Sequence, residues 1–343
     1  MDSRKIKSAN HRWSNAAVAL SSAWTVLVAT GCSNGGSSVL APRGPAAMEI
    51  ADLWWFLFWM ATAVLVIVLL FLTIALVRRQ GQQADERAAA RGGSRIVIYA
   101  GMVGPAVILL LVFSATVWTL TKLRSPVVAD ENVIHVIGRR WWWEVQYPDS
   151  QFATANEIHI PSGEPVRLVL TSPNVLHSFW VPELQGKIDL VPDAVNTLWL
   201  EADEPGVYRG TCAEFCGVQH ANMNFLVIAQ PPDAYAAWLE QQRRPADPPA
   251  DPLAQRGQEV FLNANCIDCH TVRGTSATGN LGPDLTHLAG RRTLAAGTLD
   301  NVLGNLGGWV ANPQHIKPGS LMPPADLTGV DLQALLAYLA SLE

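Results

Sequence analysis

The chain of 343 residues is poor in charge, and its net charge is slightly negative. Asp, Glu, Lys and Arg make up only 15% of the residues, and the formal net charge is −5. Proteins that bind nucleic acids carry a basic patch or stripe, commonly with interleaved aromatic side chains. The sequence has no such stripe, which excludes nucleic acid as a partner. Its length leaves room for two or three domains.

Cysteine, methionine and histidine are also scarce, but their positions are informative. The six methionines and eight histidines are mostly scattered, which argues against a copper carrier, since carriers use exposed clusters of these residues. The cysteines all fall in short motifs, so none is left for a disulfide framework. The five are Cys32, Cys212, Cys216, Cys266 and Cys269.

The first 32 residues have the layout of a secretory signal peptide. Several basic residues precede an apolar run from Ala16 to Ala29, and Thr-Gly-Cys follows. Gly31-Cys32 resembles the cleavage and lipid-attachment site of bacterial lipoproteins, although Ala29 stands where such sites usually carry leucine. We expect a signal peptide over residues 1–32 with acylation of Cys32. Cleavage without a lipid, or an uncleaved anchor, are the alternatives.

Two long runs contain no charged residue, 25 residues from Leu53 to Val77 and 26 from Ile96 to Thr121. As helices each would reach about 38 Å, more than the hydrocarbon core of roughly 30 Å. Residues 33–125 therefore predict a tether and a transmembrane hairpin with helices at about 50–78 and 95–121, not two buried helices of a soluble core. The arginine-rich loop between them is expected in the cytoplasm. All residues after Lys122 are then expected on the outer, periplasmic side of the bacterial plasma membrane.

Residues 126–230 indicate an all-β domain. Six short segments rich in Val, Ile and Leu are separated by Pro, Gly, Asn and Asp. About 100 residues of such strands predict a Greek-key sandwich. The segments are VIHVIGRR (133–140), EIHIPSG (157–163), PVRLVLTS (165–172), NTLWLEA (196–202), YRGT (208–211) and FLVIAQ (225–230).

A ligand-rich segment, TCAEFCGVQHANM (Thr211–Met223), separates the last two of these strands; we call it the copper loop. Its thiols, Cys212 and Cys216, are followed by His220 and Met223, and His177 is expected on a separate loop. Thiolate, imidazole and thioether together select copper. A single copper needs only one thiolate, so the second allows two metal ions that share the sulfurs. A disulfide, or a zinc site that leaves Met223 unused, are the alternatives.

Residues 231–252 contain six prolines and predict a semi-rigid linker after one or two helical turns. Residues 253–343 are expected to form an all-α domain. Within it, Cys266-Ile267-Asp268-Cys269-His270 is the C-x-x-C-H motif of covalent haem attachment, in which His270 ligates the iron. Met322 follows in a Pro-rich loop, and a Met/His pair suits electron transfer. His287 and His315 are the competing distal ligands.

These segments together resemble subunit II of the haem–copper oxidases in which a cytochrome c is fused to the C-terminus. The resemblance covers nearly all of residues 50–343, and it includes the copper loop, GRRWWWEVQYP and NVLHSFWVPELQGKIDLVP. It implies a membrane hairpin, a cupredoxin-like Greek-key sandwich and a class I cytochrome c domain. The family often has a glutamate early in its second membrane helix that feeds protons to subunit I. The stretch RIVIYAGMVGP has no acid.

The resemblance also implies a role for each site residue. In the binuclear copper centre, CuA, Cys212 and Cys216 bridge both coppers. His177 and His220 ligate one copper each, Met223 binds weakly, and Glu214 contributes its backbone carbonyl. The Glu214 carboxylate points towards a magnesium ion shared with subunit I. Electrons reach CuA through Trp141, and the carbonyl of Pro283 orients His270 in the haem c site.

The implied function is that of an oxidoreductase subunit without an oxygen-reducing site of its own. Its haem c takes electrons from a periplasmic or membrane-bound cytochrome c or from an upstream respiratory complex. They pass to CuA and on to subunit I, which reduces oxygen and translocates protons together with the other oxidase subunits. The alternatives are the CuA subunit of a nitric oxide reductase and a membrane-tethered copper-binding protein with a cytochrome tail. Nitrous oxide reductase would lack the membrane hairpin.

Overall fold

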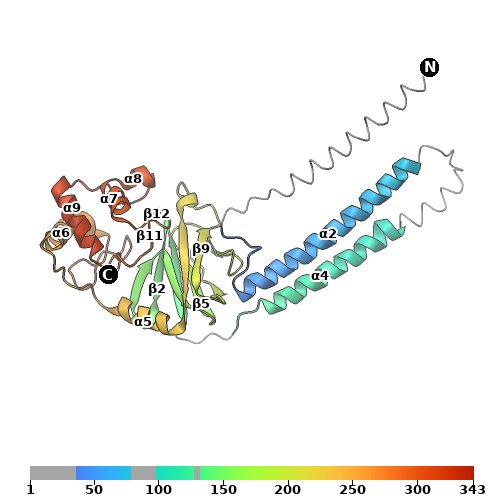
Figure 1. The fold of residues 1–343 in the computed structure, drawn as a ribbon, viewed down its shortest axis with the longest axis horizontal. Helices are drawn as coiled ribbons and strands as arrows, with labels where there is room; N and C mark the ends of the chain where they lie inside the picture. Colours follow the sequence, from blue (N-terminus) through green and yellow to red (C-terminus); the bar gives the residue numbers. More distant parts are fainter. Residues whose placement is uncertain (1–35, 79–97, 127–131) are drawn as a thin grey trace, which may run out of the picture. The chain divides into compact units, whose positions relative to one another are not determined.

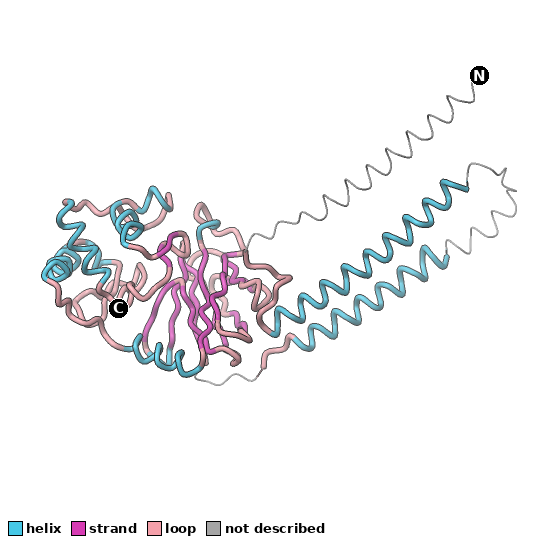
Figure 2. The backbone as a smooth tube through the Cα atoms, in the orientation of Figure 1, coloured by secondary structure: helices cyan, strands magenta, loops and turns pink. Residues whose placement is uncertain are grey.

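The computed structural model describes residues 36–78, 98–126 and 132–343 (Figure 1). The predicted signal peptide, Cys32 and the arginine-rich loop from Arg79 to Arg95 lie outside the described residues. The described chain begins with two long helices, continues as a β-sandwich and ends in a small helical domain (Figure 2). This is the predicted fold class, which is confirmed.

The two long helices are α2 (Pro45–Arg78) and α4 (Gly104–Lys122), with a short π-helical turn, η1 (Tyr99–Val103), before α4. Both are long and apolar enough to cross a membrane, and none of either most apolar window is buried. A core helix of a soluble protein would bury that surface. Helix α2 starts at Pro45, earlier than expected, because its first turn packs on the sandwich. There the amide of Ala47 donates to the carbonyl of Leu184.

The sandwich consists of two five-stranded sheets. One has the order β3-β2-β1-β5-β8 and the other β4-β10-β9-β6-β7. The first sheet contains β1 (Val133–Arg139), β2 (Trp142–Tyr147), β3 (Phe152–Ala155), β5 (Val166–Thr171) and β8 (Asn196–Leu200). The second contains β4 (Glu157–Pro161), β6 (His177–Trp180), β7 (Ile188–Leu190), β9 (Gly206–Cys212) and β10 (Asn224–Gln230). Each of the six predicted segments overlaps one of these strands.

The sandwich core follows from the alternation of side chains along the strands. In β1 and β2 every second residue is buried, and these residues meet the inward face of the other sheet. Trp143 lies at the centre of this core, with no exposed surface. Its ring packs edge-on against Phe179 and Phe225 at centroid distances of 5.9 and 5.0 Å. The packed core holds the ends of β6, β9 and β10 in fixed positions.

The segment predicted as a linker contains a longer helix than the one or two turns expected. Helix α5 (Pro232–Arg243) has 12 residues. Its Tyr235 is buried, and Trp238 and Leu239 pack on the sandwich core. Trp238 also stacks on His159 at a centroid distance of 3.9 Å. This tertiary packing stabilises a helix whose own sequence is only weakly amphipathic.

The C-terminal domain is built on α6 (Pro252–Asn263) and α9 (Gly329–Ala340), which pack against each other. A Cβ atom at Gly257 would lie 1.9 Å from the carbonyl oxygen of Ala334, so only glycine permits the close approach. Between the two helices lie η4 (Asn265–Asp268), β11 (Thr293–Leu294), β12 (Leu299–Asp300), α7 (Leu303–Ala311) and α8 (Pro313–Ile316).

Candidate metal and haem centres

The candidate metal centre forms where two neighbouring strands end. Strand β9 finishes at Cys212, the copper loop follows, and β10 begins at Asn224. His177 was expected on a separate loop, but it is the first residue of β6. Since Phe179 of β6 pairs with Cys212 of β9, the sheet itself sets the position of the imidazole relative to the thiols. A strand of four residues is too short to be recognised from its own pattern.

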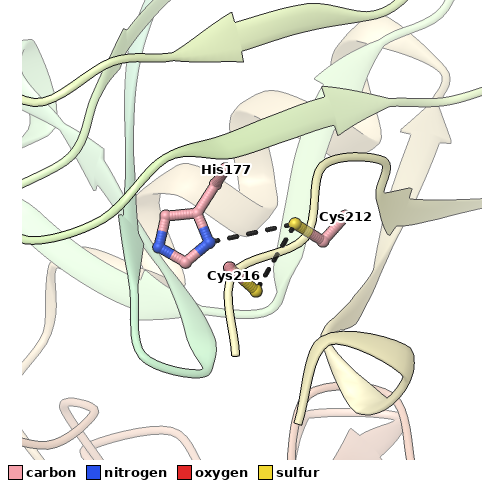
Figure 3. A group of neighbouring side chains, drawn as sticks. All are labelled: His177, Cys212 and Cys216. Carbon is pink, nitrogen blue, oxygen red and sulfur yellow. Dashed lines mark hydrogen bonds between the residues drawn. The ribbon is translucent and has the colours of Figure 1, made fainter. Parts of the chain in front are cut away.

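The predicted copper ligands converge in the structure. His177 Nδ1 lies 3.8 Å from the sulfur of Cys212, which in turn lies 3.8 Å from the sulfur of Cys216 (Figure 3). Around the Cys216 sulfur, His220 Nδ1 is 3.7 Å away and Met223 Sδ 3.8 Å. The carbonyl oxygen of Glu214 is 3.2 Å from Cys212 Sγ. The two sulfurs thus lie at the middle of a group of six donor atoms.

Four of the six residues in this donor group are buried, while His220 and Glu214 are partly exposed. Met223 and His177 have no exposed surface, and Cys212 and Cys216 are buried. A hydrogen bond with Cys216 lowers the pKa of Cys212, and the same interaction raises the pKa of Cys216. The contact between the two sulfurs therefore favours a thiolate at Cys212 and a protonated thiol at Cys216. A metal ion that displaces this proton would convert both thiols into ligating thiolates.

Tight packing holds the imidazole of His177 in place. A Cβ atom at Gly138 would lie 2.8 Å from Cδ2 of His177, so strand β1 can pass the ring only with glycine at this position. The Trp143 ring lies on another side of the imidazole, at a centroid distance of 6.0 Å. These two contacts restrict the ring, and His177 presents Nδ1 to the Cys212 sulfur. His177 Nε2 is buried and has no hydrogen-bond partner.

The three consecutive tryptophans of β2 and the turn before it have different surroundings. Trp141 is partly buried, and its indole Nε1 donates a hydrogen bond to the carbonyl oxygen of Cys216, 2.9 Å away. Trp142 lies under the guanidinium of Arg139 at 5.7 Å, and Trp143 fills the core. Trp143 reaches the end of the copper loop, where its Nε1 lies 3.5 Å from the carbonyl oxygen of Met223, whereas Trp141 contacts the middle of the loop at Cys216.

The Glu214 carboxylate is partly exposed and pairs with a lysine. Its side chain is 39% exposed, and an oxygen lies 3.8 Å from Lys187 Nζ. Among the described residues, one group of three His, Cys, Asp or Glu side chains has ligand atoms close enough to share a metal ion, namely His177, Cys212 and Cys216. Within this part of the chain, Glu214 gains no second carboxylate or imidazole that would build a magnesium site.

The haem-attachment motif forms a tight turn at η4. The amide of His270 donates to the carbonyl of Cys266, and His270 Nδ1 lies 2.8 Å from the carbonyl oxygen of Pro283. A proton on Nδ1 directed at this carbonyl leaves Nε2 free to bind iron. Burial lowers the pKa of His270, which favours the neutral, ligating form. A Cβ atom at Gly282 would lie 2.7 Å from the imidazole.

The three candidate distal ligands are distinguished by their contacts. Both ring nitrogens of His287 face backbone carbonyls, Nδ1 that of Glu343 at 2.6 Å and Nε2 that of Arg244 at 3.1 Å. His287 is buried in these contacts and His315 is exposed. Met322 is partly buried, and Gln314 Nε2 donates to its carbonyl oxygen at 3.0 Å. Met322 lies on a loop, and its thioether sulfur makes no hydrogen bond to a backbone carbonyl of the described residues. Of the three candidates, it is therefore the one best placed to act as the distal ligand.

Comparison with known proteins gives a family match for the sandwich domain and another for the C-terminal domain. Residues 150–230 match the family model described as cytochrome c oxidase subunit II, periplasmic domain, and residues 254–343 match that of cytochrome c. Cytochrome c oxidase subunit 2 of Alkalihalophilus pseudofirmus is 37% identical over 341 residues, covering 96% of this chain and 98% of that protein. This chain belongs to the cytochrome c oxidase subunit II family. It carries the additional cytochrome c domain.

Two further relatives in the subunit II family match over most of their length. The subunit of Bacillus sp. strain PS3 is 32% identical over 78% of this chain and 79% of that protein. The subunit of Bacillus subtilis is 29% identical over 92% of this chain and 95% of that protein. The family implies copper in the first domain, and the cytochrome c match implies haem in the second.

The residues at the two sites fit the implied copper and the implied haem. A disulfide does not hold Cys212 and Cys216, which are free, with sulfurs 3.8 Å apart. The thioether of Met223 faces a sulfur, and a zinc site would leave it unused. Two thiols, two imidazole nitrogens, a thioether and a carbonyl in a buried pocket make up a soft donor set suited to copper. The haem motif has its proximal imidazole already oriented.

Proposed function

We propose that this subunit II receives electrons at its cytochrome c domain and relays them through the copper loop to subunit I of a proton-translocating oxidase, where oxygen is reduced. One observation carries the proposal. A complete set of copper donors surrounds two buried thiols in the same chain as a haem-attachment motif with an oriented imidazole. When bound, the copper pair and the haem supply one-electron redox chemistry, which the chain's own side chains lack.

The proposed assignment of ligands follows the contacts. Cys212 and Cys216 would hold two copper ions through their shared sulfurs, and His177 and His220 would offer one Nδ1 each. Met223 Sδ and the Glu214 carbonyl complete the group. In the C-terminal domain, the thiols of Cys266 and Cys269 would attach the haem, and His270 and Met322 would ligate its iron. The carbonyl of Pro283 orients His270.

The protein around these donors contributes rigidity and exclusion of water. His177 and Cys212 lie at the ends of paired strands, and Cys212, Cys216 and Met223 belong to the same buried cluster as Trp143, Phe179 and Phe225. Ligands that cannot move on reduction keep the geometric change between oxidation states small, which lowers the barrier to electron transfer. Trp141 adds a direct contact between the exterior and the Cys216 backbone, as suits the residue through which electrons arrive.

The membrane helices and the cytochrome domain indicate where the subunit is located and what it contacts. The apolar helices α2 and α4 anchor the chain in a bacterial plasma membrane next to subunit I and the other oxidase subunits, with the copper and cytochrome domains on the outer side. There the cytochrome domain meets its donor, a periplasmic or membrane-bound cytochrome c or an upstream respiratory complex. Magnesium at the Glu214 carboxylate, shared with subunit I, stays a prediction.

The substitution C216S in the assembled oxidase tests the order of the relay. It removes one bridging sulfur from the copper pocket and touches no residue of the haem motif. We expect an external donor to reduce the c-type haem of the variant at the wild-type rate, while the haems of subunit I stay oxidised and oxygen consumption stops. Reduction of subunit I at the wild-type rate in this variant would contradict the proposal. Consumption of nitric oxide rather than oxygen by the wild-type complex would assign the subunit to a nitric oxide reductase.

A further inference from the structure

A lysine ammonium is buried between the copper-loop domain and the cytochrome domain. Lys317 is 3% exposed, and its Nζ donates to three backbone carbonyls. Two of them belong to the sandwich domain, Trp141 O and Asn222 O, both at 2.8 Å. The third, Ala295 O at 3.1 Å, belongs to the cytochrome domain. All three N–H groups of the ammonium are therefore used.

Such burial is tolerated only with this full set of partners. A charged group taken out of water without hydrogen bonds costs several kcal/mol. Burial lowers the pKa of Lys317 to about 8, so the side chain is still mostly protonated at neutral pH and donates all three bonds. The lysine thus fits one arrangement of the two domains, in which the carbonyls of Trp141 and Asn222 converge on it.

The partners of Lys317 connect the two redox sites. Trp141 is the residue whose indole binds the Cys216 carbonyl, and Asn222 immediately precedes Met223. On its own domain, Lys317 lies five residues before Met322. In the same loop, the Pro318 carbonyl accepts a hydrogen bond of 2.8 Å from Gln219 Nε2 of the copper loop. The loop that carries the proposed haem ligand is therefore bonded directly to the copper loop.

A second buried charge fixes the same interface from the opposite side. Glu157, on β4 of the sandwich, is 2% exposed. One of its carboxylate oxygens accepts hydrogen bonds from the backbone amides of Arg292 and Thr293 at 2.7 and 2.9 Å. Here the anion comes from the sandwich and the backbone donors from the cytochrome domain. Each domain thus inserts one buried charge into the main chain of the other.

This pattern differs from the surface of a domain that docks transiently. Exposed ion pairs on long side chains tolerate many orientations and contribute little. Buried charges bonded to backbone groups demand fixed distances and angles, and they specify a unique arrangement. Further main-chain bonding continues the contact, since the amide of Asn224 donates to the Ala296 carbonyl at 3.0 Å.

We propose that Lys317 is a positioning residue that locks the Met322 loop onto Trp141 and the copper loop. Glu157 is its counterpart on the β11 side. The cytochrome domain then transfers electrons to the copper loop from one fixed docked state, not as a tethered domain that searches for its site. The inference rests on the proposed relay function, which it deepens by naming the residues that hold its two halves in register.

The test compares K317M with K187M in the full-length subunit within the assembled oxidase. Both variants remove one lysine charge near the copper loop, but Lys187 is half exposed and pairs only with Glu214 among the described contacts. The first readout is amide hydrogen exchange of residues 219–224 and 291–298. The second is the rate of electron transfer from haem to copper after flash reduction of the haem. E157Q is the second variant, which removes charge from the opposite domain without touching Trp141.

We expect K317M and E157Q to speed exchange in both segments by at least about tenfold. K317M removes three hydrogen bonds, and E157Q removes the carboxylate charge that strengthens the bonds from Arg292 and Thr293. Haem-to-copper transfer should slow by at least about tenfold and become sensitive to viscosity, with an unchanged haem spectrum. K187M should alter neither readout. Wild-type transfer in both K317M and E157Q, or faster exchange confined to the segment next to each substitution, would overturn the proposal. Exchange needs no metal, so the docking is tested even if the copper content contradicts the proposed function.

Discussion

The indole Nε1 of Trp141 donates a hydrogen bond of 2.9 Å to the carbonyl oxygen of Cys216. This bond joins the turn before β2 to the middle of the copper loop, between residues 75 positions apart in the sequence. It gives the aromatic ring a defined place against the loop that holds both thiols. Because Trp143 is buried in the core and Trp142 packs against Arg139, we expect Trp141 to be the tryptophan through which electrons enter.

The first prediction concerns this bond. W141F keeps an aromatic ring but removes the N–H group, and a single hydrogen bond of this kind contributes about 1 kcal/mol to stability. We expect a small loss in melting temperature and a clear slowing of haem-to-copper electron transfer, measured after flash reduction. W142F is the matched control, because Trp142 packs against Arg139 and not against the copper loop. Equal slowing in both variants would contradict the assignment to Trp141.

The second prediction concerns Gly138. The added methyl group of G138A would meet the His177 ring at 2.8 Å, so the imidazole must move away from Cys212. Displacing the support of a metal ligand typically costs roughly 10- to 100-fold in metal affinity, and we expect a loss of this size in copper titrations. G308A is the control, since a Cβ atom there meets nothing within 4 Å. Wild-type copper affinity in G138A would show that His177 does not bind the metal.

The third prediction concerns Gly282 beside the haem motif. A Cβ atom at this position would lie 2.7 Å from the His270 ring, and overpacking of this kind typically costs about 1–3 kcal/mol. We expect G282A to turn the imidazole off the Pro283 carbonyl, which should shift the haem midpoint potential and lower the yield of attached haem. G290A, where the nearest atom would be 3.7 Å away, should behave as wild type. An unchanged potential and yield in G282A would exclude His270 as the axial ligand.

The fourth prediction is a dependence of stability on pH. His159 stacks on Trp238 and its Nδ1 lies 2.8 Å from Gln230 Oε1. Burial lowers its pKa from 6.5 to about 4, with a further lowering by Arg292 and an opposing effect of Gln230. Because the fold favours neutral His159, the unfolded chain binds more protons between those pH values. Stability should therefore fall as the pH drops through this window, by at most about 3 kcal/mol.

The substitution H159F tests this origin of the acid sensitivity. A phenyl ring can keep the stack on Trp238 and cannot bind a proton. We expect the urea midpoint of H159F to decline less than that of wild type between pH 6.5 and 4. Parallel declines in both proteins would assign the acid sensitivity to other groups.

The sequence was sufficient to predict the fold class and the residues that gather at the metal centre. Local patterns carry that information, since the apolar helices, the alternating strands and the spacing of Cys212, Cys216, His220 and Met223 are all short-range features. The strands that could not be predicted from the sequence are short or have an unusual composition. Strand β6 has four residues, and β2 begins in a run of tryptophans that resembles a surface anchor as much as a strand.

Contacts between distant segments could not be predicted. From the sequence alone, Lys317 is expected to be an ordinary loop lysine. In the structure it donates a hydrogen bond to the carbonyl of Trp141, 176 residues away. Glu157 lies in a strand whose sequence has no unusual feature. Its partners are backbone amides, and no pattern of residue types can identify such partners. Gly138 likewise shows no sign that an imidazole packs on it. Such roles depend on how the domains pack, so only the three-dimensional structure reveals them.

The central claim is that the two buried thiols hold a pair of copper ions in a chain that also carries haem. It is tested most directly by counting copper and iron in the full-length subunit, purified from a host that attaches haem c, and by the electron paramagnetic resonance spectrum of its oxidised form. We expect two coppers for each iron and one unpaired electron shared equally between the coppers. One copper with a mononuclear spectrum, or zinc in its place, would contradict it.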